Sequence, residues 1–170
     1  MNPMRNIVVE KLTLNVGAGK DVARLEKGVK LIKHITGITP VKTVTNKRIQ
    51  QWGLRPGLPI GTKVTMRGKQ AHEFLRRLFA ANDMLVNERS FDRQGNLAFG
   101  VPEYIDIPEV KYDPDLGIMG FEAAVTVTRP GYRVKSRRLS TKVGKHHVVT
   151  KQESIEYFTK EFGIKIGEKA

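Results

Sequence analysis

The sequence predicts an α+β fold: a single domain over residues 1–170, with a mainly antiparallel sheet, helices on one face and two basic loop extensions. Three observations lead to this prediction. Apolar residues recur now at strand spacing and now at helix spacing, but without the regular strand–helix–strand rhythm of a doubly wound sheet. Loops containing proline and glycine join several of the expected strands directly. A chain of 170 residues that is 39% hydrophobic is also sufficient for one core.

The first expected elements are a strand at residues 6–16 and a helix at about residues 21–36. A turn at Gly17–Gly19 separates them. The helix is indicated by an apolar stripe at helical spacing, and Gly37 is a residue that commonly follows a helix C-terminus. The stripe consists of Val22, Leu25, Val29, Ile32 and Ile35.

A second strand is expected at residues 40–46, where side chains alternate along an extended segment. Residues 47–59 follow, and their prolines and glycines predict a projecting loop rather than a regular element. We expect a third strand at residues 61–67 and a second helix at about residues 69–82. The apolar stripe of that helix is Ala71, Phe74, Leu75, Leu78 and Phe79.

Two further strands are predicted, at residues 96–101 and 121–128. Between them, residues 102–120 are rich in turn-forming residues, so we expect an irregular connection. Alternation is clearest in the second of these strands. There, one face is formed by Phe121, Ala123, Val125 and Val127.

The C-terminal part begins with a basic excursion at residues 129–147. Thr150 and Glu153 then form a capping box, in which a threonine and a glutamate three residues later bond to each other's backbone N–H groups. We therefore expect a helix from there to Phe162. A last short strand is predicted at residues 164–166.

The charge distribution is the strongest functional signal. The chain carries 30 Lys and Arg against 17 Asp and Glu, a formal net charge of +13. Two windows, residues 27–72 and 123–152, contain no acidic residue and hold 18 of the 30 basic ones. A surface that is merely well solvated mixes the two signs, whereas segregated positive charge is typical of a nucleic-acid interface.

Several function classes are excluded. The chain has no cysteine, so it has no disulfide, no thiolate metal site and no thiol nucleophile. No apolar run approaches the roughly 20 residues of a spanning helix, and the N-terminus does not lead into the apolar region of a signal peptide. We therefore expect a soluble, cytoplasmic protein without a membrane partner. No base, nucleophile and orienting group come together, so we expect no enzyme, no cofactor and no metal site.

The segment Gly17–Asp21 is similar to a phosphate-binding loop at first sight. Such a loop needs a glycine at the position of Leu14 and a Ser or Thr at the position of Asp21, so nucleotide binding is not indicated. A plain turn and a turn whose N–H groups receive an RNA phosphate both remain open. His146 and His147 make a poor metal pair, because neighbours on extended backbone point apart.

The two basic excursions are more informative. Trp52 stands between Lys47-Arg48 and Arg55. It could stack on a base or ribose, or it could fold back and hold the loop against the core, and the sequence leaves both open. Residues 129–138 include five cations and a tyrosine without a counter-charge, which indicates contact with a polyanion.

Ordered blocks of residues, spread over nearly the whole chain, suggest a family. They are Leu14–Asp21, Ile35–Gly37, Lys47–Ile49, Trp52–Gly68, Phe91-Asp92, Gly95-Asn96, Phe99-Gly100, Glu103–Pro108 and Arg129–Val134. In these blocks the sequence resembles the L-five family of large-subunit ribosomal proteins, in its archaeal and eukaryotic form.

The resemblance implies a function. Members of the family bind 5S rRNA in the central protuberance of the large subunit, through the sheet face of an α+β fold and neighbouring loops. Asn15, Thr65 and Arg67 match polar positions of that surface, whereas Ile38 stands where bacterial members have glutamine. Together with cations of the basic segments, the predicted rRNA-binding residues are Asn15, Lys20, Lys42, Lys63, Thr65, Arg67, Arg129, Arg133, Lys135, Arg137 and Arg138.

The resemblance also implies further partners. The loop at residues 47–59 matches the one that approaches peptidyl-site tRNA, and residues 129–147 match a segment that contributes to a bridge with a small-subunit protein. The expected partners are 5S rRNA, large-subunit rRNA, peptidyl-site tRNA and neighbouring ribosomal proteins, within the cytoplasmic ribosome. The predicted tRNA-facing residues are Lys47, Arg48, Trp52, Arg55 and Pro56.

Two other function classes fit the basic charge less well. A DNA-compacting architectural protein would show intercalating apolar wedges or a dimerising helix, and neither is evident. An RNA-modifying enzyme would need a cofactor motif, which the sequence lacks. Equal binding of 5S rRNA and duplex DNA would favour the first class, and turnover of an RNA substrate would favour the second.

Overall fold

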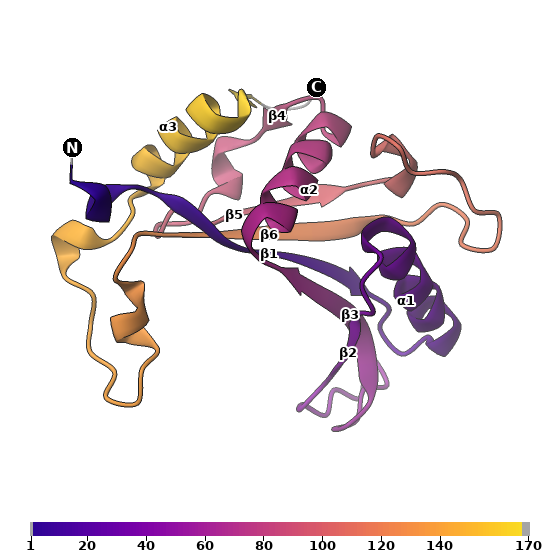
Figure 1. Cartoon of the computed structure of the whole chain (residues 1–170). Helices are drawn as coiled ribbons and strands as arrows, with labels where there is room; N and C mark the ends of the chain where they lie inside the picture. Colours follow the sequence, from indigo (N-terminus) through magenta and orange to yellow (C-terminus); the bar gives the residue numbers. More distant parts are fainter. Residues whose placement is uncertain (1, 168–170) are drawn as a thin grey trace. The chain divides into compact units, whose positions relative to one another are not determined.

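The structure is a computed structural model that describes residues 2–167, and it confirms an α+β fold with a mainly antiparallel five-stranded sheet (Figure 1). The strand order is β2-β3-β1-β6-β5. These strands are β1 (Val8–Gly17), β2 (Val41–Val44), β3 (Pro59–Met66), β5 (Leu97–Val101) and β6 (Phe121–Thr128). The α-helices are α1 (Val22–Thr36), α2 (Gly68–Ala81) and α3 (Lys151–Phe162). Two short strands, β4 (Leu85–Val86) and β7 (Lys165–Ile166), pair in parallel.

The described residues form two compact units. Unit 1 consists of the chain up to Leu12, residues Met66–Phe99 and the chain from Ala124 onward. Unit 2 consists of Thr13–Thr65 and Gly100–Ala123. That residues 1–170 act as one domain stays a prediction.

In unit 2, helix α1 packs closely on strands β1 and β3. Gly28 makes this possible: a Cβ added there would lie 3.1 Å from Val16 and 3.2 Å from the Thr62 hydroxyl oxygen. The helix begins as predicted, because the Asp21 carboxylate accepts hydrogen bonds from the N–H groups of the first turn. It ends at Gly37, whose φ of 70° is the left-handed conformation that glycine adopts without strain.

In unit 1, helices α2 and α3 meet in an aromatic cluster centred on Phe79. The Phe79 ring stacks on Phe99 of β5 with centroids 5.4 Å apart and makes edge contacts with Phe158 and Phe162 of α3. The predicted capping box of α3 is confirmed, since Thr150 and Glu153 satisfy each other's backbone N–H groups.

Most predicted elements are confirmed with end shifts of one or two residues, and residues 102–120 contain only a short 3-10 turn at Tyr104–Asp106. Strand β4 was not predicted, because two residues show no periodicity that a sequence pattern can reveal. Within the described chain, no helix is long and apolar enough to cross a membrane.

Candidate nucleic-acid interface

One face of the sheet in unit 2 points away from α1. Along β3, Thr62 and Val64 are buried while Lys63 and Thr65 are exposed, because successive side chains of a strand point to opposite faces. Since Thr62 and Val16 lie against α1, the other face carries Lys63, Thr65 and, from β1, Asn15. Side chains therefore alternate between the two faces along β3. Arg67, exposed and in an extended conformation, continues this alternation two residues after Thr65.

Glu122 of β6 joins this face, and the sequence analysis missed it. The Asn15 side-chain amide donates a hydrogen bond to a Glu122 carboxylate oxygen over 3.3 Å. A signal was present, since Phe121 and Ala123 on the buried face place Glu122 on the other one. We call the surface of Asn15, Lys63, Thr65 and Glu122 the open face.

Lys42 and Lys20 do not belong to the open face. In the antiparallel pairing of β2 with β3, Lys42 lies directly opposite Thr62, and such partners share a face, so Lys42 points to the α1 side. Lys42 is exposed, but on the side of the sheet opposite to Lys63. That Lys42 binds rRNA stays a prediction. Lys20 instead extends toward Gly53, where an added Cβ would lie 3.5 Å from its side chain.

The turn between β1 and α1 is already satisfied by the protein. The backbone N–H groups of Ala18 and Gly19 both donate to the carbonyl oxygen of Ile60, at 2.9 and 3.0 Å. The first N–H groups of α1 bond to the Asp21 carboxylate. Of the two interpretations left open, the plain turn is favoured, because these N–H groups are not free for a phosphate.

A hairpin loop, residues 45–58, connects β2 and β3 and projects beyond them (Figure 1). It is more regular than predicted. Ile49 and Leu54 exchange two backbone hydrogen bonds of 3.1 and 3.0 Å around a tight turn in which Gly53 has a φ of 65°. At the base of the loop, Thr45 is bonded to both Leu58 and Gly57.

Trp52 lies at the tip of this hairpin loop and is 64% exposed. The alternative in which it folds back onto the core is therefore wrong; the residue that anchors the loop is Leu54, which is 8% exposed. The remaining predicted tRNA-facing residues are all exposed as well. They are Lys47, Arg48, Arg55 and Pro56.

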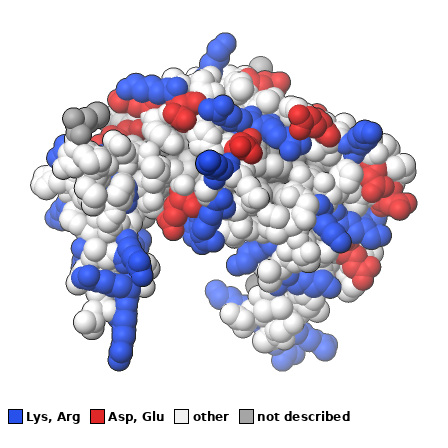
Figure 2. Space-filling model, viewed as in Figure 1, with Lys and Arg blue, Asp and Glu red and all other residues white. Residues whose placement is uncertain are grey.

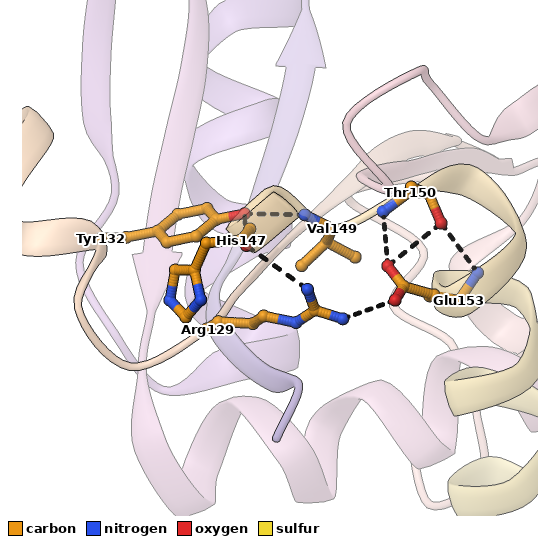
Figure 3. A network of polar contacts seen from close by, with 6 residues as sticks. All are labelled: Arg129, Tyr132, His147, Val149, Thr150 and Glu153. Atoms are coloured by element: carbon orange, nitrogen blue, oxygen red, sulfur yellow. Dashed lines mark hydrogen bonds and ion pairs between the residues drawn. The ribbon is translucent and has the colours of Figure 1, made fainter. Parts of the chain in front are cut away.

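The second excursion, residues 129–150, is here called the basic loop, and its base is held by the polar network in Figure 3. Arg129 is 6% exposed, and its guanidinium donates to Glu153 of α3 over 2.6 Å. The expectation that Arg129 faces RNA is contradicted by this burial. Arg129 follows the end of β6 directly and neutralises Glu153 at the start of α3, because a buried charge needs a partner.

Glu153 is correspondingly shifted in its ionisation. The pKa of Glu153 is lowered from 4.5, and the largest cause is the hydrogen bond from the Thr150 backbone N–H. Burial raises the pKa by less than this bond lowers it, and the Arg129 side chain lowers it further. The Glu153 carboxylate therefore accepts the backbone N–H of Thr150 in the capping box and is also the partner of Arg129.

Tyr132 and His147 close the base of the basic loop (Figure 3). The Tyr132 hydroxyl accepts from the backbone N–H of Val149 over 2.8 Å and donates to the carbonyl oxygen of His147 over 3.3 Å. The His147 ring lies 2.8 Å from the carbonyl oxygen of Pro130, so His147 is a structural residue of the loop. Four predicted rRNA-binding cations farther along the loop stay exposed, namely Arg133, Lys135, Arg137 and Arg138.

A cavity of about 1210 Å³ lies between the basic loop and the neighbouring strands of unit 1. Arg133, Lys135 and Lys142 line it from the loop, Thr126 lines it from β6 and Glu10 from β1. Figure 2 shows Lys and Arg, and no Asp or Glu, at the free ends of the basic loop and of the hairpin loop in this view. Each excursion therefore presents positive charge without a counter-charge.

Possible metal ligands and histidines are also present in the part of the chain that the structure describes. No cluster of three or more His, Asp or Glu is arranged there to hold a metal ion. His34 and His72 have structural contacts instead, with the carbonyl oxygen of Lys111 and with Glu161, respectively.

Comparisons with known proteins show which family the chain belongs to. The family model described as "Ribosomal protein L5" matches residues 2–55, and the model that describes the C-terminus of the same ribosomal protein family matches residues 59–157. The "Large ribosomal subunit protein uL5" of Nanoarchaeum equitans (strain Kin4-M) is 48% identical over 167 residues, covering 97% of this chain and 98% of the relative. The proteins of the same name from Sulfurisphaera tokodaii and Methanococcus vannielii are 42% and 45% identical, covering 99% and 96% of this chain and 96% and 93% of the relatives. The chain therefore belongs to the uL5 family of large-subunit ribosomal proteins.

Proposed function

We propose that this chain binds 5S rRNA through the open face and helps to attach it in the central protuberance of the large subunit. The observation that supports this most is the placement of Asn15, Lys63 and Thr65 together on the sheet face that α1 leaves uncovered. Uncharged hydrogen-bonding groups beside a cation are what a protein needs to position itself on a folded RNA.

The two kinds of side chain have different tasks. Lys63 and Arg67 neutralise phosphates and release counterions, which gives affinity that falls steeply with salt. Asn15 and Thr65 form hydrogen bonds with defined geometry and fix the register of the RNA on the sheet. The β-strands hold these side chains on a rigid support, so little ordering is required when RNA binds.

The hairpin loop is proposed to contact peptidyl-site tRNA. Its support is the exposed Trp52 at the tip, flanked by Arg48 and Arg55. An exposed indole stacks on a base or ribose while neighbouring cations hold the phosphates. The tight Ile49–Leu54 pairing keeps the tip in place before the tRNA arrives.

The basic loop is proposed to contact large-subunit rRNA and to take part in a bridge to the small subunit. Its exposed cations include Arg133, Lys135, Arg137 and Arg138. Arg129 is left out of this proposal because it is paired with Glu153. Leu139, which directly follows Arg138, is 80% exposed and offers an apolar contact to a protein partner.

The test compares binding of 5S rRNA and of an unrelated structured RNA at moderate salt with competitor. The variant is Asn15→Ala, Thr65→Ala, Arg67→Ala, and the control is Lys30→Ala on the exposed side of α1, which removes the same single charge. We expect the triple variant to lose preference for 5S rRNA by at least about tenfold, since hydrogen bonds to nucleic acid contribute on the order of 1 kcal/mol each, and the control to keep it.

Equal binding of both RNAs by the wild-type protein would contradict the proposal, because the basic segments would then form only a general RNA-binding surface. Duplex DNA is included as a third ligand. Binding of DNA as tight as that of 5S rRNA would favour an architectural DNA-binding role instead.

A further inference from the structure

We propose that Glu122 determines specificity on the open face: its carboxylate accepts a hydrogen bond from a minor-groove donor of the bound RNA, either a ribose 2′-hydroxyl or a guanine amino group. This inference rests on the proposed function of the same face. It starts from an anomaly, since a carboxylate stands on the surface proposed to receive a polyanion.

The position of Glu122 is well defined. It lies on β6 between the buried Phe121 and Ala123, which are 5% and 0% exposed, so its own side chain stands on the opposite, open side. The 3.3 Å hydrogen bond from Asn15 on the neighbouring strand β1 holds the carboxylate beside the amide. The hydrogen-bond partner of Glu122 is thus an uncharged amide.

Phosphate groups are excluded as neighbours of this carboxylate. A phosphate carries the same charge and has no hydrogen to donate, so the two groups repel each other when RNA displaces water between them. An RNA that lies on the open face must therefore place something else against Glu122. The group must be a hydrogen-bond donor, because an ionised carboxylate only accepts.

RNA geometry limits which donors can reach a sheet surface. The major groove of an A-form helix is too deep and narrow for side chains, whereas its wide, shallow minor groove displays 2′-hydroxyls and base edges. The donors there are the 2′-hydroxyl and the guanine amino group. Glu122 can accept from either, and the adjacent Asn15 amide can bond to the neighbouring acceptor on the same edge.

A carboxylate at this point also penalises wrong RNAs. An RNA that presents a phosphate to Glu122 meets repulsion, and an RNA without a donor there leaves the carboxylate charge unsatisfied as water is excluded. Discrimination of this kind lowers affinity for every RNA except the one with a donor at the matching position. Removal of the Glu122 charge should therefore change the affinities for 5S rRNA and for other RNAs in opposite directions, which binding measurements can detect.

The experiment measures dissociation constants of the intact protein for 5S rRNA and for an unrelated structured RNA. The proteins are wild type, Glu122→Gln, Glu122→Ala and the charge control Glu26→Gln, which removes an exposed carboxylate from α1. We expect both Glu122 variants to bind the unrelated RNA more tightly and 5S rRNA more weakly, so that the preference falls about tenfold, the size of one hydrogen bond to a charged group. Glu26→Gln should keep the wild-type preference.

Each alternative gives a different result. A purely structural role for Glu122 would weaken binding of both RNAs together, and a general charge effect would strengthen binding of both by the same factor. Either result overturns the inference. Loss of preference in the wild-type protein itself would instead mean that the proposed function fails, so the two failures are distinguishable.

A second arm identifies the donor. The 5S rRNA is prepared with occasional inosine in place of guanosine, which removes the amino group, or with occasional 2′-deoxynucleotides. Positions at which one of these replacements weakens binding to wild type but not to Glu122→Ala locate the partner as guanine amino group or 2′-hydroxyl. If every interfering position affects both proteins equally, Glu122 has no such partner and the inference is wrong.

Discussion

At the scale of single residues, Arg129 and Glu153 determine how the basic loop joins α3. The Arg129 guanidinium is almost completely buried, so removal of its partner leaves a charge without compensation. Its Nε atom has no hydrogen-bond partner, which makes the bond to Glu153 the main compensation for its burial. Breaking this pair therefore destabilises the protein more than breaking a surface ion pair does.

We predict that Glu153→Gln lowers the free energy of unfolding at neutral pH by about 1–3 kcal/mol. Because the pKa of Glu153 in the folded state lies below 4.5, its stabilising contribution is complete above that value and is lost as the pH falls through the folded-state pKa. The difference between wild type and variant should therefore shrink in acid. Urea denaturation across this range measures it.

The matched control is Glu156→Gln, which removes an exposed carboxylate of the same helix. It should change stability by no more than about 0.5 kcal/mol at any of these pH values. An equal loss in both variants would show that the Arg129 pairing contributes nothing.

Trp52 is the only tryptophan of the chain, so its fluorescence reports on the tip of the hairpin loop alone. We predict quenching or a blue shift when tRNA is added, because stacking removes the indole from water. Trp52→Ala should weaken tRNA binding by about 1–3 kcal/mol while the unfolding free energy changes by less than about 0.5 kcal/mol. Unchanged emission at saturating tRNA would contradict a contact at this residue.

At the scale of elements, the turn before β5 is packed tightly against the start of α3. Gly95 has a φ of 76°, and an added Cβ would lie 2.9 Å from Val149 and 3.0 Å from Ser154. The buried Ser154 hydroxyl also donates to the Gly95 carbonyl oxygen over 2.6 Å. This turn therefore fixes the start of α3, and with it the end of the basic loop.

We predict that Gly95→Ala destabilises the protein by about 2 kcal/mol or more, through backbone strain and through overlap with Val149 and Ser154. Gly144→Ala is the control, because its φ is −58° and an added Cβ there meets nothing within 4 Å. Thermal unfolding of both variants measures the difference. Similar melting temperatures would show that the turn adapts.

Elements with a regular pattern over several residues were predictable from the sequence, and the contacts between elements were not. The apolar stripe of α2 and the capping box of α3 depend on neighbours a few residues apart, which a sequence pattern displays directly. The orientation of Lys42 depends on its register against β3, and the burial of Arg129 depends on a glutamate that is 24 residues away. Neither distance is encoded in local periodicity.

The candidate site was predictable to a similar degree. Thr65 was predicted from the family resemblance and is exposed on β3, while Glu122 was missed because only the apolar members of β6 were used. The exposure of Trp52 depends on the Ile49–Leu54 pairing, which cannot be predicted from a loop sequence rich in proline and glycine.

At the scale of the whole molecule, membership of the uL5 family makes the chain a structural component of the ribosome in the cytoplasm rather than an enzyme. Its charge is organised accordingly. The net charge of +13 is concentrated in two sequence windows free of acidic residues, so a polyanion is needed to relieve the repulsion within them.

We predict that the affinities for 5S rRNA and for unrelated RNA fall with salt along similar steep slopes, because counterion release contributes to both. The preference for 5S rRNA should survive, since it depends on hydrogen bonds of Asn15 and Thr65 that salt does not screen. Titrations at several salt concentrations measure both quantities. Loss of the preference at high salt would indicate that it is electrostatic.

Directed cleavage of 5S rRNA tests whether the open face contacts this RNA. The chain has no cysteine, so one can be introduced at Thr13 of β1, beside Asn15 on the open side, or at Lys30 on the exposed side of α1, and labelled with an iron chelate that generates hydroxyl radicals. We predict strong, localised cleavage of 5S rRNA from Thr13→Cys and little from Lys30→Cys. Cleavage from Lys30→Cys alone would contradict the account.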